Sequence, residues 1–546
     1  MTSDNPSSPE MAVRKRTRSA MARKKLARRA GAIWVFAVVF ALSATIGMFR
    51  RDSTSDTAPV YPGNPPPTPQ LSLETILPST GYLTPVAITP SPTAMPSVTP
   101  TFGPTIGAPL MYTTQAGDTL QLIAGRFMVS PGEIKSLKPV SSSSLLEPGQ
   151  LLLIPNRLAK TTPNTILFPD SETVYSPTAL DLDVEAFVKQ KNGYLATYRE
   201  YLNSSGWNNG AQLIERIALD NSINPRLLLS LLEYQSGWVT GQPATTETTD
   251  YPLGYHDPLA KGLFQQLSWA VSELSLGYYG WRNGLVVDLT FTDGQVLRLS
   301  PELNAGTVAV QYYFAHFMTK ADWEKALYST DSVVALHTSL FGDASLRAES
   351  IEPLYPSSLS QPELILPFET DVIWSFTFGP HSAWGPEGAR AALDFAPASM
   401  SSGCVPSDAW VTAAATGQVV RSQNGVVVID LDGDGKEQSG WVLIYLHIAK
   451  EDRIPDKSWV AVGDRIGHPS CEGGNATGTH FHIARKYNGE WMLAGGAIPF
   501  DMSGWQAQAG NSPGEGILVK GDRLVVACTC SDFKTNIIRP KDDTSQ

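Results

Sequence analysis

The stretch that decides the fold of the C-terminal region reads Cys471-Glu-Gly-Gly-Asn-Ala-Thr-Gly-Thr-His480-Phe-His482-Ile-Ala-Arg-Lys-Tyr487. Its first half is rich in glycine and small polar residues, which is typical of a loop. Its second half is typical of a β-strand, where residues two apart point to the same face. The sequence therefore predicts that His480 and His482 present two imidazole rings on one face of a strand.

Similar short runs surround this stretch, separated by glycine and aspartate turns. They read AWVTAAATGQVV from residue 409, GVVVIDL from 425, WVLIYLHI from 441 and WVAVGDRIG from 459. β-Branched and alternating runs of this length favour an antiparallel sheet. We therefore expect an antiparallel all-β domain over residues 365–535, in which the late stretch GILVKGDRLVVACTC adds further β-structure.

Four of the eight histidines lie at informative places in this domain. Besides His480 and His482, His447 follows the apolar run 442–446, and His381 ends the tetrapeptide Phe-Gly-Pro-His. A carboxylate, Asp394, lies in the run Ala-Ala-Leu-Asp-Phe. A single histidine is usually structural, but a His-x-His with a further histidine and an aspartate at separate strand ends indicates a functional site.

These segments together resemble the lysostaphin-type metallopeptidases, especially their beta-lytic and staphylolytic branch. The resemblance covers residues 365–500 and rests on Gly379-Pro-His381, Leu393-Asp394-Phe395, Tyr445-Leu-His447 and the stretch from Cys471 to His482. It implies that His381, Asp394 and His482 hold Zn²⁺ and that His447 and His480 are catalytic. Two imidazoles and one carboxylate are a known catalytic zinc set that leaves a fourth position open.

The segment departs from most of the wider family at one position. That family has a histidine four residues before the aspartate, and here the position holds Arg390, which cannot bind zinc. The beta-lytic branch takes its first histidine from the Gly-x-His segment instead. His381 lies 13 residues before Asp394, as that branch has it, so we expect the zinc site to be complete.

Two functions follow from this resemblance and stay open at the level of sequence. The first is a zinc endopeptidase that hydrolyses peptide bonds in cell-wall peptidoglycan. The alternative is a non-catalytic scaffold that binds peptidoglycan or activates another wall hydrolase. The zinc content of the purified protein separates the two.

A second family resemblance lies upstream, over residues 109–156. The segment contains Gly117-Asp-Thr-Leu120, and Pro148-Gly-Gln150 before Ile154-Pro155. These motifs resemble those of a LysM module. The resemblance implies a βααβ fold that binds N-acetylglucosamine chains such as those of peptidoglycan. We expect a helix with Leu120, Leu122, Ile123 and Phe127 on one face, a second helix from about Ser130, and a strand at 150–154. Lys138 stands where the family usually has asparagine. A small module without a ligand is the alternative.

Residues 183–350 show helical periodicity and predict an all-α domain. The stretches 223–238 and 262–266 resemble lytic transglycosylases, which have a lysozyme-like fold. The position of their catalytic acid holds Gln235, and an amide cannot protonate a glycosidic oxygen. Glu233 lies about 200° around the helix and points to another face. We therefore expect a non-catalytic glycan-binding or spacer domain.

The N-terminal part predicts a membrane anchor. Residues 1–30 form a basic tail, residues 31–49 carry no charge and are long enough to span a bilayer, and residues 50–108 form a linker rich in proline, threonine and serine. A second linker is expected at 157–182. The basic tail predicts an uncleaved single-pass helix with the later domains outside, facing the cell wall. A cleaved signal peptide is the alternative. The net charge of −11 argues against nucleic acid as a partner.

The four cysteines all lie in the predicted exported part, where disulfides form. We expect Cys404 to pair with Cys471, and the alternative partners of Cys471 are Cys528 and Cys530. The run Asp430-Leu-Asp-Gly-Asp434-Gly435 matches the first half of a calcium loop. Position 12 of that loop would be Trp441 in place of an acid, so an ordinary hairpin tip is the favoured interpretation.

Overall fold

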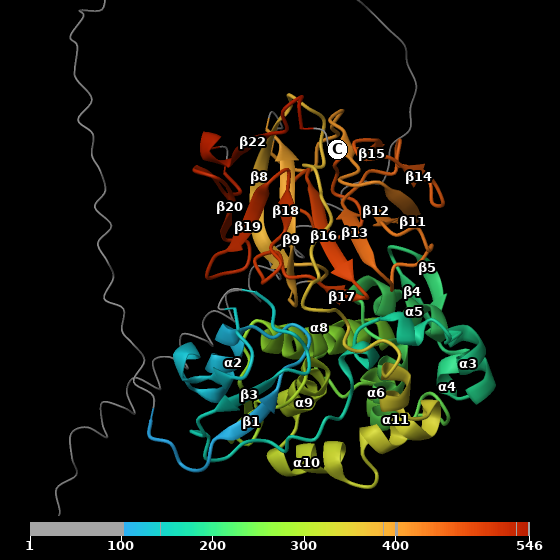
Figure 1. Cartoon of the computed structure of the whole chain (residues 1–546). Helices are drawn as coiled ribbons and strands as arrows, with labels where there is room; N and C mark the ends of the chain where they lie inside the picture. The colour runs from blue at the N-terminus through green and yellow to red at the C-terminus, as the bar shows by residue number, and fades with distance from the viewer. Residues whose placement is uncertain (1–102, 142–143, 386, 399–401, 531, 544–546) are drawn as a thin grey trace, which may run out of the picture. The chain divides into compact units, whose positions relative to one another are not determined.

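The computed structural model describes residues 103–141, 144–385, 387–398, 402–530 and 532–543 (Figure 1). The predicted basic tail and anchor, and all but the last residues of the first linker, lie outside these ranges. Within the described ranges no helix has both the length and the hydropathy needed to cross a bilayer. The contacts divide the chain into residues 1–97 and 98–546, and every element below belongs to the second unit.

The first described domain is a small sheet with one helix. Its elements are β1 (Leu110–Thr113), α2 (Leu120–Phe127), η1 (Pro131–Glu133), β2 (Lys135–Ser136) and β3 (Leu151–Ile154), with strand order β1-β3-β2. The prediction of a second helix is wrong, because only the single 3₁₀ turn η1 forms there. Ser130 and Glu133 cap this turn, and Ile134 then returns to extended backbone and leads into β2.

The next domain is mainly helical. Its helices are α3 (Val184–Lys191), α4 (Tyr194–Thr197), α5 (Gly210–Asn221), α6 (Pro225–Ser236), α7 (Thr246–Asp250), α8 (Leu263–Arg282), α9 (Ala305–Phe317), α10 (Lys320–Tyr328), α11 (Val333–Phe341) and α12 (Ala344–Ala348). The prediction of an all-α domain needs a correction, since two hairpins interrupt it: β4 (Arg199–Leu202) with β5 (Gly206–Asn209), and β6 (Asp288–Thr290) with β7 (Val296–Arg298). Gly294 adopts φ +81° in the second hairpin, in the Asp-Gly pair that favours such turns.

The prediction of a linker at 157–182 is also wrong for most of its length. The segment contains η2 (Asp170–Glu172) and η3 (Pro177–Ala179), and Phe168 and Val174 are completely buried in the helical core. The carboxylate of Asp170 accepts hydrogen bonds from Asn304 Nδ2 (2.8 Å) and from the Gly306 amide (2.7 Å). Buried apolar side chains and a satisfied buried carboxylate make this segment part of the domain.

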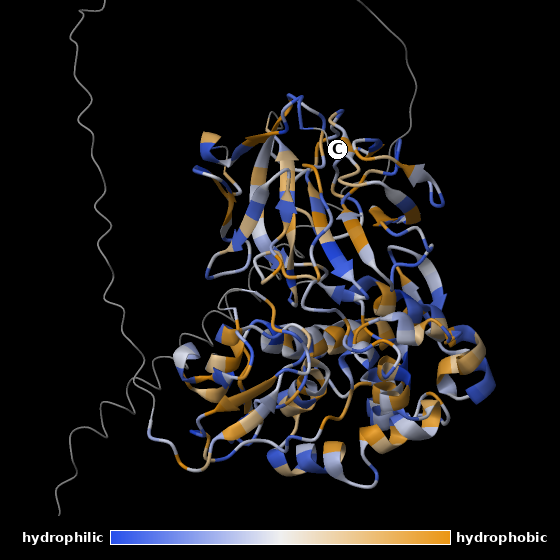
Figure 2. Cartoon of the chain, viewed as in Figure 1, coloured by the Kyte–Doolittle hydropathy of each residue, from blue (hydrophilic) through white to orange (hydrophobic). Residues whose placement is uncertain are grey.

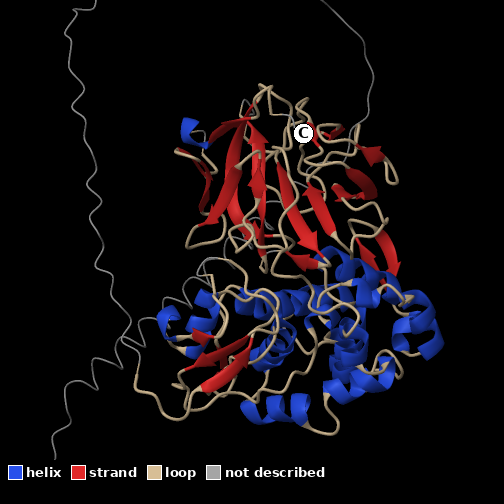
Figure 3. Ribbon diagram, viewed as in Figure 1, coloured by secondary structure: helices blue, strands red, loops and turns tan. Residues whose placement is uncertain are grey.

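The C-terminal domain is built on one large sheet of order β14-β11-β12-β13-β16-β9-β8-β22, to which β17 adds at β16 (Figure 3). The strands are β8 (Ile373–Ser382), β9 (Arg390–Pro397), β11 (Gly417–Gln423), β12 (Val426–Asp430), β13 (Trp441–Leu446), β14 (Trp459–Val460), β16 (Phe481–Tyr487), β17 (Glu490–Trp491) and β22 (Asn536–Ile538). Smaller sheets join β10 (Val411–Thr412) with β15 (Arg465–Gly467), and join β18 (Asp501–Met502), β19 (Trp505–Ala509), β20 (Gly516–Lys520) and β21 (Arg523–Val526).

All pairs in this domain are antiparallel, which confirms the predicted strand arrangement. The late strands β20 and β21 form the expected added β-structure. Strand β22 extends the domain slightly past residue 535, because Ile537 pairs with Trp374 of β8. Figure 2 shows hydrophobic segments on both strands and helices, as expected where each kind of element buries a core.

The helical domain contacts the end of the large sheet near β17. Ser222 Oγ donates to the Gly489 carbonyl (2.7 Å), and the Trp491 amide donates to Tyr279 Oη (2.9 Å). Arg421 of β11 forms an ion pair with Asp220 at 2.5 Å. The contacts of Gly489 and Trp491 lie just past the last residue of β16, Tyr487, whereas His482 is the second residue of that strand.

Candidate metal centre

Three of the predicted site residues lie on three adjacent strands. His482 on β16 pairs directly with Asp394 on β9, and Asp394 pairs with Phe378 on β8. The register of β8 shifts between Phe378 and His381 and again after His381. Such irregularities re-aim a side chain, and here they bring the imidazole of His381 to the other two side chains.

The three candidate ligand atoms form a nearly equilateral triangle. His381 Nε2 lies 3.1 Å from His482 Nδ1, and Asp394 Oδ1 lies 3.2 Å from each of these nitrogens. Two ligands that bind tetrahedral zinc at about 2.0–2.1 Å are themselves roughly 3.3–3.4 Å apart. The side chains are therefore arranged as a three-ligand zinc site requires, without any rearrangement of the strands.

The outer nitrogen of each imidazole is fixed by a backbone carbonyl. His381 Nδ1 lies 2.8 Å from the Gly379 carbonyl, and His482 Nε2 lies 3.0 Å from the Ala383 carbonyl. Each of these nitrogens donates its proton to the carbonyl, so the lone pair of the inner nitrogen points into the triangle. Metal-binding histidines are usually oriented in this way.

Asp394 is a buried carboxylate, and one of its oxygens accepts no hydrogen bond from a described residue. Its Oδ1 has no hydrogen-bond partner in the described part of the chain, although the residue is only 8% exposed. Burial alone would raise the pKa of Asp394, but the adjacent imidazoles of His381 and His482 outweigh it and hold the pKa well below its usual range. An ionised oxygen that is buried without a donor fits a metal ligand.

The other two predicted residues, His447 and His480, lie beside the triangle. Their rings are 4.5 Å apart, and His480 Nε2 lies 3.5 Å from Asp394 Oδ2. His447 follows β13 directly and adopts a left-handed backbone conformation, with φ +64°. Non-glycine residues in this conformation often mark functional sites.

Backbone carbonyls orient this second pair as well. His447 Nδ1 lies 2.8 Å from the Glu472 carbonyl, and His480 Nδ1 lies 2.8 Å from the Gly478 carbonyl. Burial, followed by the nearby His480 and His482, lowers the pKa of His447 to about 4. His447 is therefore neutral at neutral pH, with its Nε2 lone pair free to accept a proton.

The loop that supplies these carbonyls is tied down by a disulfide. Cys404 and Cys471 are bonded, as predicted, with their Cα atoms 5.8 Å apart. Glu472, whose carbonyl accepts the His447 proton, is the next residue after Cys471. Cys528 and Cys530 are bonded to each other. The sequence carried no signal for the roles of the Glu472 and Gly478 carbonyls, since any residue type can offer one.

Arg390 takes no part in the triangle. It begins β9 and pairs with Ser382, whereas His381 pairs with Ala392. The described residues that could hold a metal in this domain form two groups, and the first is His381, Asp394 and His482.

The second group is Asp430, Asp432 and Asp434, in the connection between β12 and β13. The carboxylate of Asp430 already accepts the amide protons of Gly433 (3.2 Å) and Gly435 (2.8 Å). This is the bonding of a turn, and it agrees with the interpretation of a hairpin tip.

The helical domain does not assemble a comparable site around Gln235. Glu233 caps the end of α6, where its carboxylate accepts the amide protons of Val239 (2.8 Å) and Thr240 (3.0 Å). Glu273 of α8 is a further candidate for a functional carboxylate, which the sequence did not indicate. It lies 3.1 Å from His316 Nδ1. No motif marks Glu273, because it sits in an ordinary helical pattern.

Two family models match the chain. The model of the LysM domain matches residues 112–155, and that of the LasA N-terminal domain matches residues 166–354. The chain therefore contains a LysM domain followed by a LasA-like N-terminal domain, and the second match begins inside the segment predicted as a linker. A search of curated proteins finds no match.

Solved structures similar to part of the chain include three peptidases. A novel M23 metalloprotease, pseudoalterin, from the deep sea is 22% identical, covers 31% of this chain and 96% of its own, and has a TM-score of 0.27. A zinc-containing peptidase from Vibrio cholerae is 19% identical, with coverages of 26% and 41% and a TM-score of 0.19. The catalytic domain of the antimicrobial peptidase lysostaphin from Staphylococcus simulans is 20% identical, with coverages of 23% and 89% and a TM-score of 0.17.

Proposed function

We propose that this protein is a zinc-dependent endopeptidase that cleaves peptides of cell-wall peptidoglycan. The observation that carries the proposal is the triangle of His381 Nε2, Asp394 Oδ1 and His482 Nδ1, with sides of 3.1–3.2 Å and outer nitrogens fixed by carbonyls. Three protein ligands with one open position are the arrangement of a catalytic zinc site. The site lies in the part of the chain that resembles lysostaphin-type peptidases.

The residues divide into ligands and proton carriers. His381, Asp394 and His482 would hold the metal, and a zinc ion bound there supplies a Lewis acid that lowers the pKa of water and polarises a carbonyl. His447 is neutral and accepts a proton at Nε2 from the attacking water. His480, when it carries a proton at Nε2, donates a hydrogen bond to the oxygen on which negative charge develops.

The LysM domain supports peptidoglycan as the substrate, since the module resembles those that bind N-acetylglucosamine chains. Residues 31–49 would anchor the chain in the cell membrane, with the later domains outside and facing the wall. Residues 50–108 are long enough to carry these domains away from the membrane surface, at about 3.1 Å per residue in an extended proline-rich segment.

The test uses purified peptidoglycan and the exported part of the chain, residues 50–546. We expect one zinc per chain and new amino termini on wall peptides, both lost after chelation and both restored by added zinc. Cleavage that survives complete removal of the metal would contradict the proposal. Protein that never takes up zinc yet binds the wall would favour the non-catalytic scaffold.

A further inference from the structure

The C-terminal segment of the chain covers the outer edge of β8, the strand that carries His381. Strand β22 pairs with the first part of β8. The Cys528 amide then donates to the Phe376 carbonyl (3.2 Å), and the loop 510–515 bonds to the residues just before His381. Without this segment β8 would be an edge strand of the large sheet, with a row of unpaired backbone groups.

The loop 510–515 joins β19 to β20 and bonds to β8 at two points. The Gly379 amide donates to the Gly514 carbonyl (2.8 Å), and the Gly514 amide donates to the Pro380 carbonyl (3.1 Å). All three of these residues are buried. The two hydrogen bonds run in opposite directions between the same two segments, as in an antiparallel ladder. The loop therefore fixes the backbone of β8 immediately before His381.

The backbone that the loop fixes is the part of β8 that orients a predicted zinc ligand. The Gly379 carbonyl accepts the Nδ1 proton of His381 at 2.8 Å. Gly379 is thus bonded to Gly514 through its amide and to the imidazole through its carbonyl. The pairing of β8 with β9 shifts register on both sides of His381, so the ladder of the large sheet alone does not set this geometry.

The side chain of Phe378 makes a second contact between the loop and the ligand. Its ring centre lies 4.9 Å from that of His381, with the two planes at 64°. A Cβ atom built on Gly514 would lie 2.0 Å from atoms of the same ring. Gly514 also adopts φ +83°, a conformation that glycine reaches without strain. Only glycine at this position lets the loop approach Phe378 so closely.

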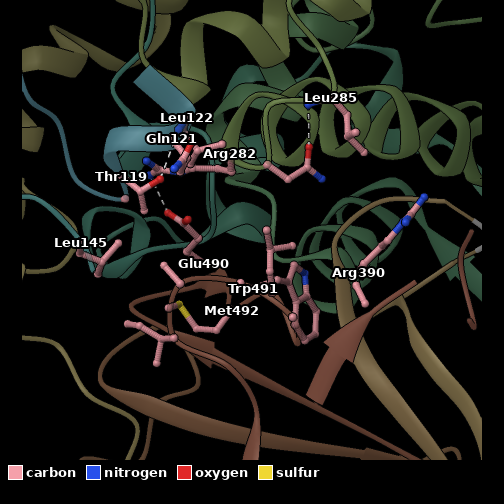
Figure 4. Close-up of a pocket in the computed structure, with 18 of the residues that line it drawn as sticks. Thr119, Gln121, Leu122, Leu145, Arg282, Leu285, Arg390, Glu490, Trp491 and Met492 are labelled. Carbon is pink, nitrogen blue, oxygen red and sulfur yellow. Dashed lines mark hydrogen bonds and ion pairs between the residues drawn. The ribbon is translucent and has the colours of Figure 1, made fainter. Parts of the chain in front are cut away.

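Arg390 makes a weaker connection between the loop and β9. It lines a cavity of about 460 Å³, and Figure 4 shows it apart from Arg282 and Glu490, which pair with each other at 2.8 Å. Its guanidinium donates to the Asn511 carbonyl at 3.4 Å, near the upper limit for a hydrogen bond. Asn511 is exposed, so we expect the loop to keep its place without this bond.

We propose that the loop 510–515 positions His381 for metal binding, through the backbone of Gly514 and the ring of Phe378. The inference rests on the proposed function, because it takes His381 to be a zinc ligand. Gly514 is a positioning residue, since it acts on the ligand through Gly379 and Phe378. The β-structure after residue 500 then supports the metal centre from outside the large sheet.

The test measures the zinc affinity of the full chain in detergent, by competition with a chromophoric chelator. Gly514→Ala should weaken zinc binding about 10–100-fold, which is typical of losing a group that orients a metal-binding histidine. The matched control is Gly521→Ala, in the turn between β20 and β21. Gly521 also has a positive φ, +60°, but no atom of a described residue lies within 4 Å of an added Cβ. Its zinc affinity should stay within twofold.

A second variant, Phe378→Ala, removes the ring and leaves the loop glycine in place. It should weaken zinc binding at least tenfold, whereas Arg390→Ala should stay within twofold. The double variant Gly514→Ala with Phe378→Ala should lose less affinity than the product of the two single losses, because the added methyl group no longer meets the ring. The visible spectrum of the cobalt(II) form, which depends on ligand geometry, should change in Gly514→Ala and Phe378→Ala only.

Thermal unfolding of each metal-free variant shows whether it is folded at the temperature of the measurement. If Gly514→Ala does not fold, Phe378→Ala decides. Unchanged zinc affinity and an unchanged cobalt spectrum in the folded variants would overturn the positioning role and leave the proposed peptidase intact. A loss in Gly521→Ala as large as that in Gly514→Ala would also overturn it, since backbone strain alone would then suffice. An unmodified chain that takes up no zinc would contradict the proposed function and this inference together.

Discussion

The region around Gln235 in the helical domain and the region around Asp394 in the sheet domain each contain a buried polar atom that has no hydrogen-bond partner among the described residues. In the first region it is Gln235 Nε2, and in the second it is Asp394 Oδ1. Gly254 lies beside the Gln235 carboxamide, and the carboxylate of the nearby Glu233 caps the end of α6. Two imidazole nitrogens lie 3.2 Å from Asp394 Oδ1.

The difference shows that the chemical role of a buried polar atom depends on the groups that surround it. A neutral amide such as that of Gln235 carries no charge and has no acidic proton to give in acid catalysis. An ionised carboxylate between two oriented imidazoles has a complete ligand set. Chemistry is therefore expected in the sheet domain alone, and variants in the two regions should differ sharply.

The largest effect on turnover without loss of metal is expected for His480→Ala. His480 adjoins the reacting groups but lies outside the ligand triangle, so zinc should stay bound. The kcat should fall by about 10²–10⁴, which is typical of losing a group that transfers or stabilises a proton. His468→Ala is the matched control, since His468 lies in the same domain and its ring packs against Trp410. Loss of zinc from His480→Ala would show that His480 is a ligand.

A smaller, mainly structural effect is expected when Cys404 and Cys471 are both replaced by serine. This disulfide closes a loop of 67 residues, and its loss should lower the free energy of unfolding by about 2–4 kcal/mol. The kcat should fall as well, because the Glu472 carbonyl that orients His447 follows Cys471.

Denaturant unfolding and steady-state kinetics measure the two effects of this change. The matched control replaces Cys528 and Cys530, whose bond spans only two residues and lies outside the site. Equal stability and kcat in the two double variants would contradict a role of the Cys404–Cys471 bond in holding the loop.

The smallest effect is expected in the helical domain. The chain with Asp394→Asn, which keeps the helical domain intact, should release no anhydro-muropeptides from purified wall, because Gln235 cannot act as an acid. Gln235→Ala in the unmodified chain should leave peptide cleavage within twofold. Mass spectrometry of the soluble products is the measurement. Anhydro products from the Asp394→Asn chain would direct attention to another carboxylate, with Glu273 as the first candidate.

The sequence predicted which side chains form the site better than it predicted the backbone irregularities that position them. The placement of His480 and His482 on one face follows from strand periodicity, which is a local property. The convergence of His381 and Asp394 with this pair was expected from the resemblance to lysostaphin-type peptidases. The register shifts of β8 that aim His381 depend on how three strands pair, and no local pattern records them. The linker prediction failed for a related reason, since the burial of Phe168 and Asp170 depends on contacts with residues far along the chain.

The most direct test of the account compares the zinc content of His381→Ala with that of Arg390→Ala. His381 Nε2 is one corner of the ligand triangle, whereas Arg390 lies outside it. Elemental analysis of the two purified variants should find zinc lost from His381→Ala, because two protein ligands fall short of the three expected at a catalytic zinc. It should find about one zinc per chain in Arg390→Ala. Full zinc in His381→Ala would contradict the assignment of the metal centre.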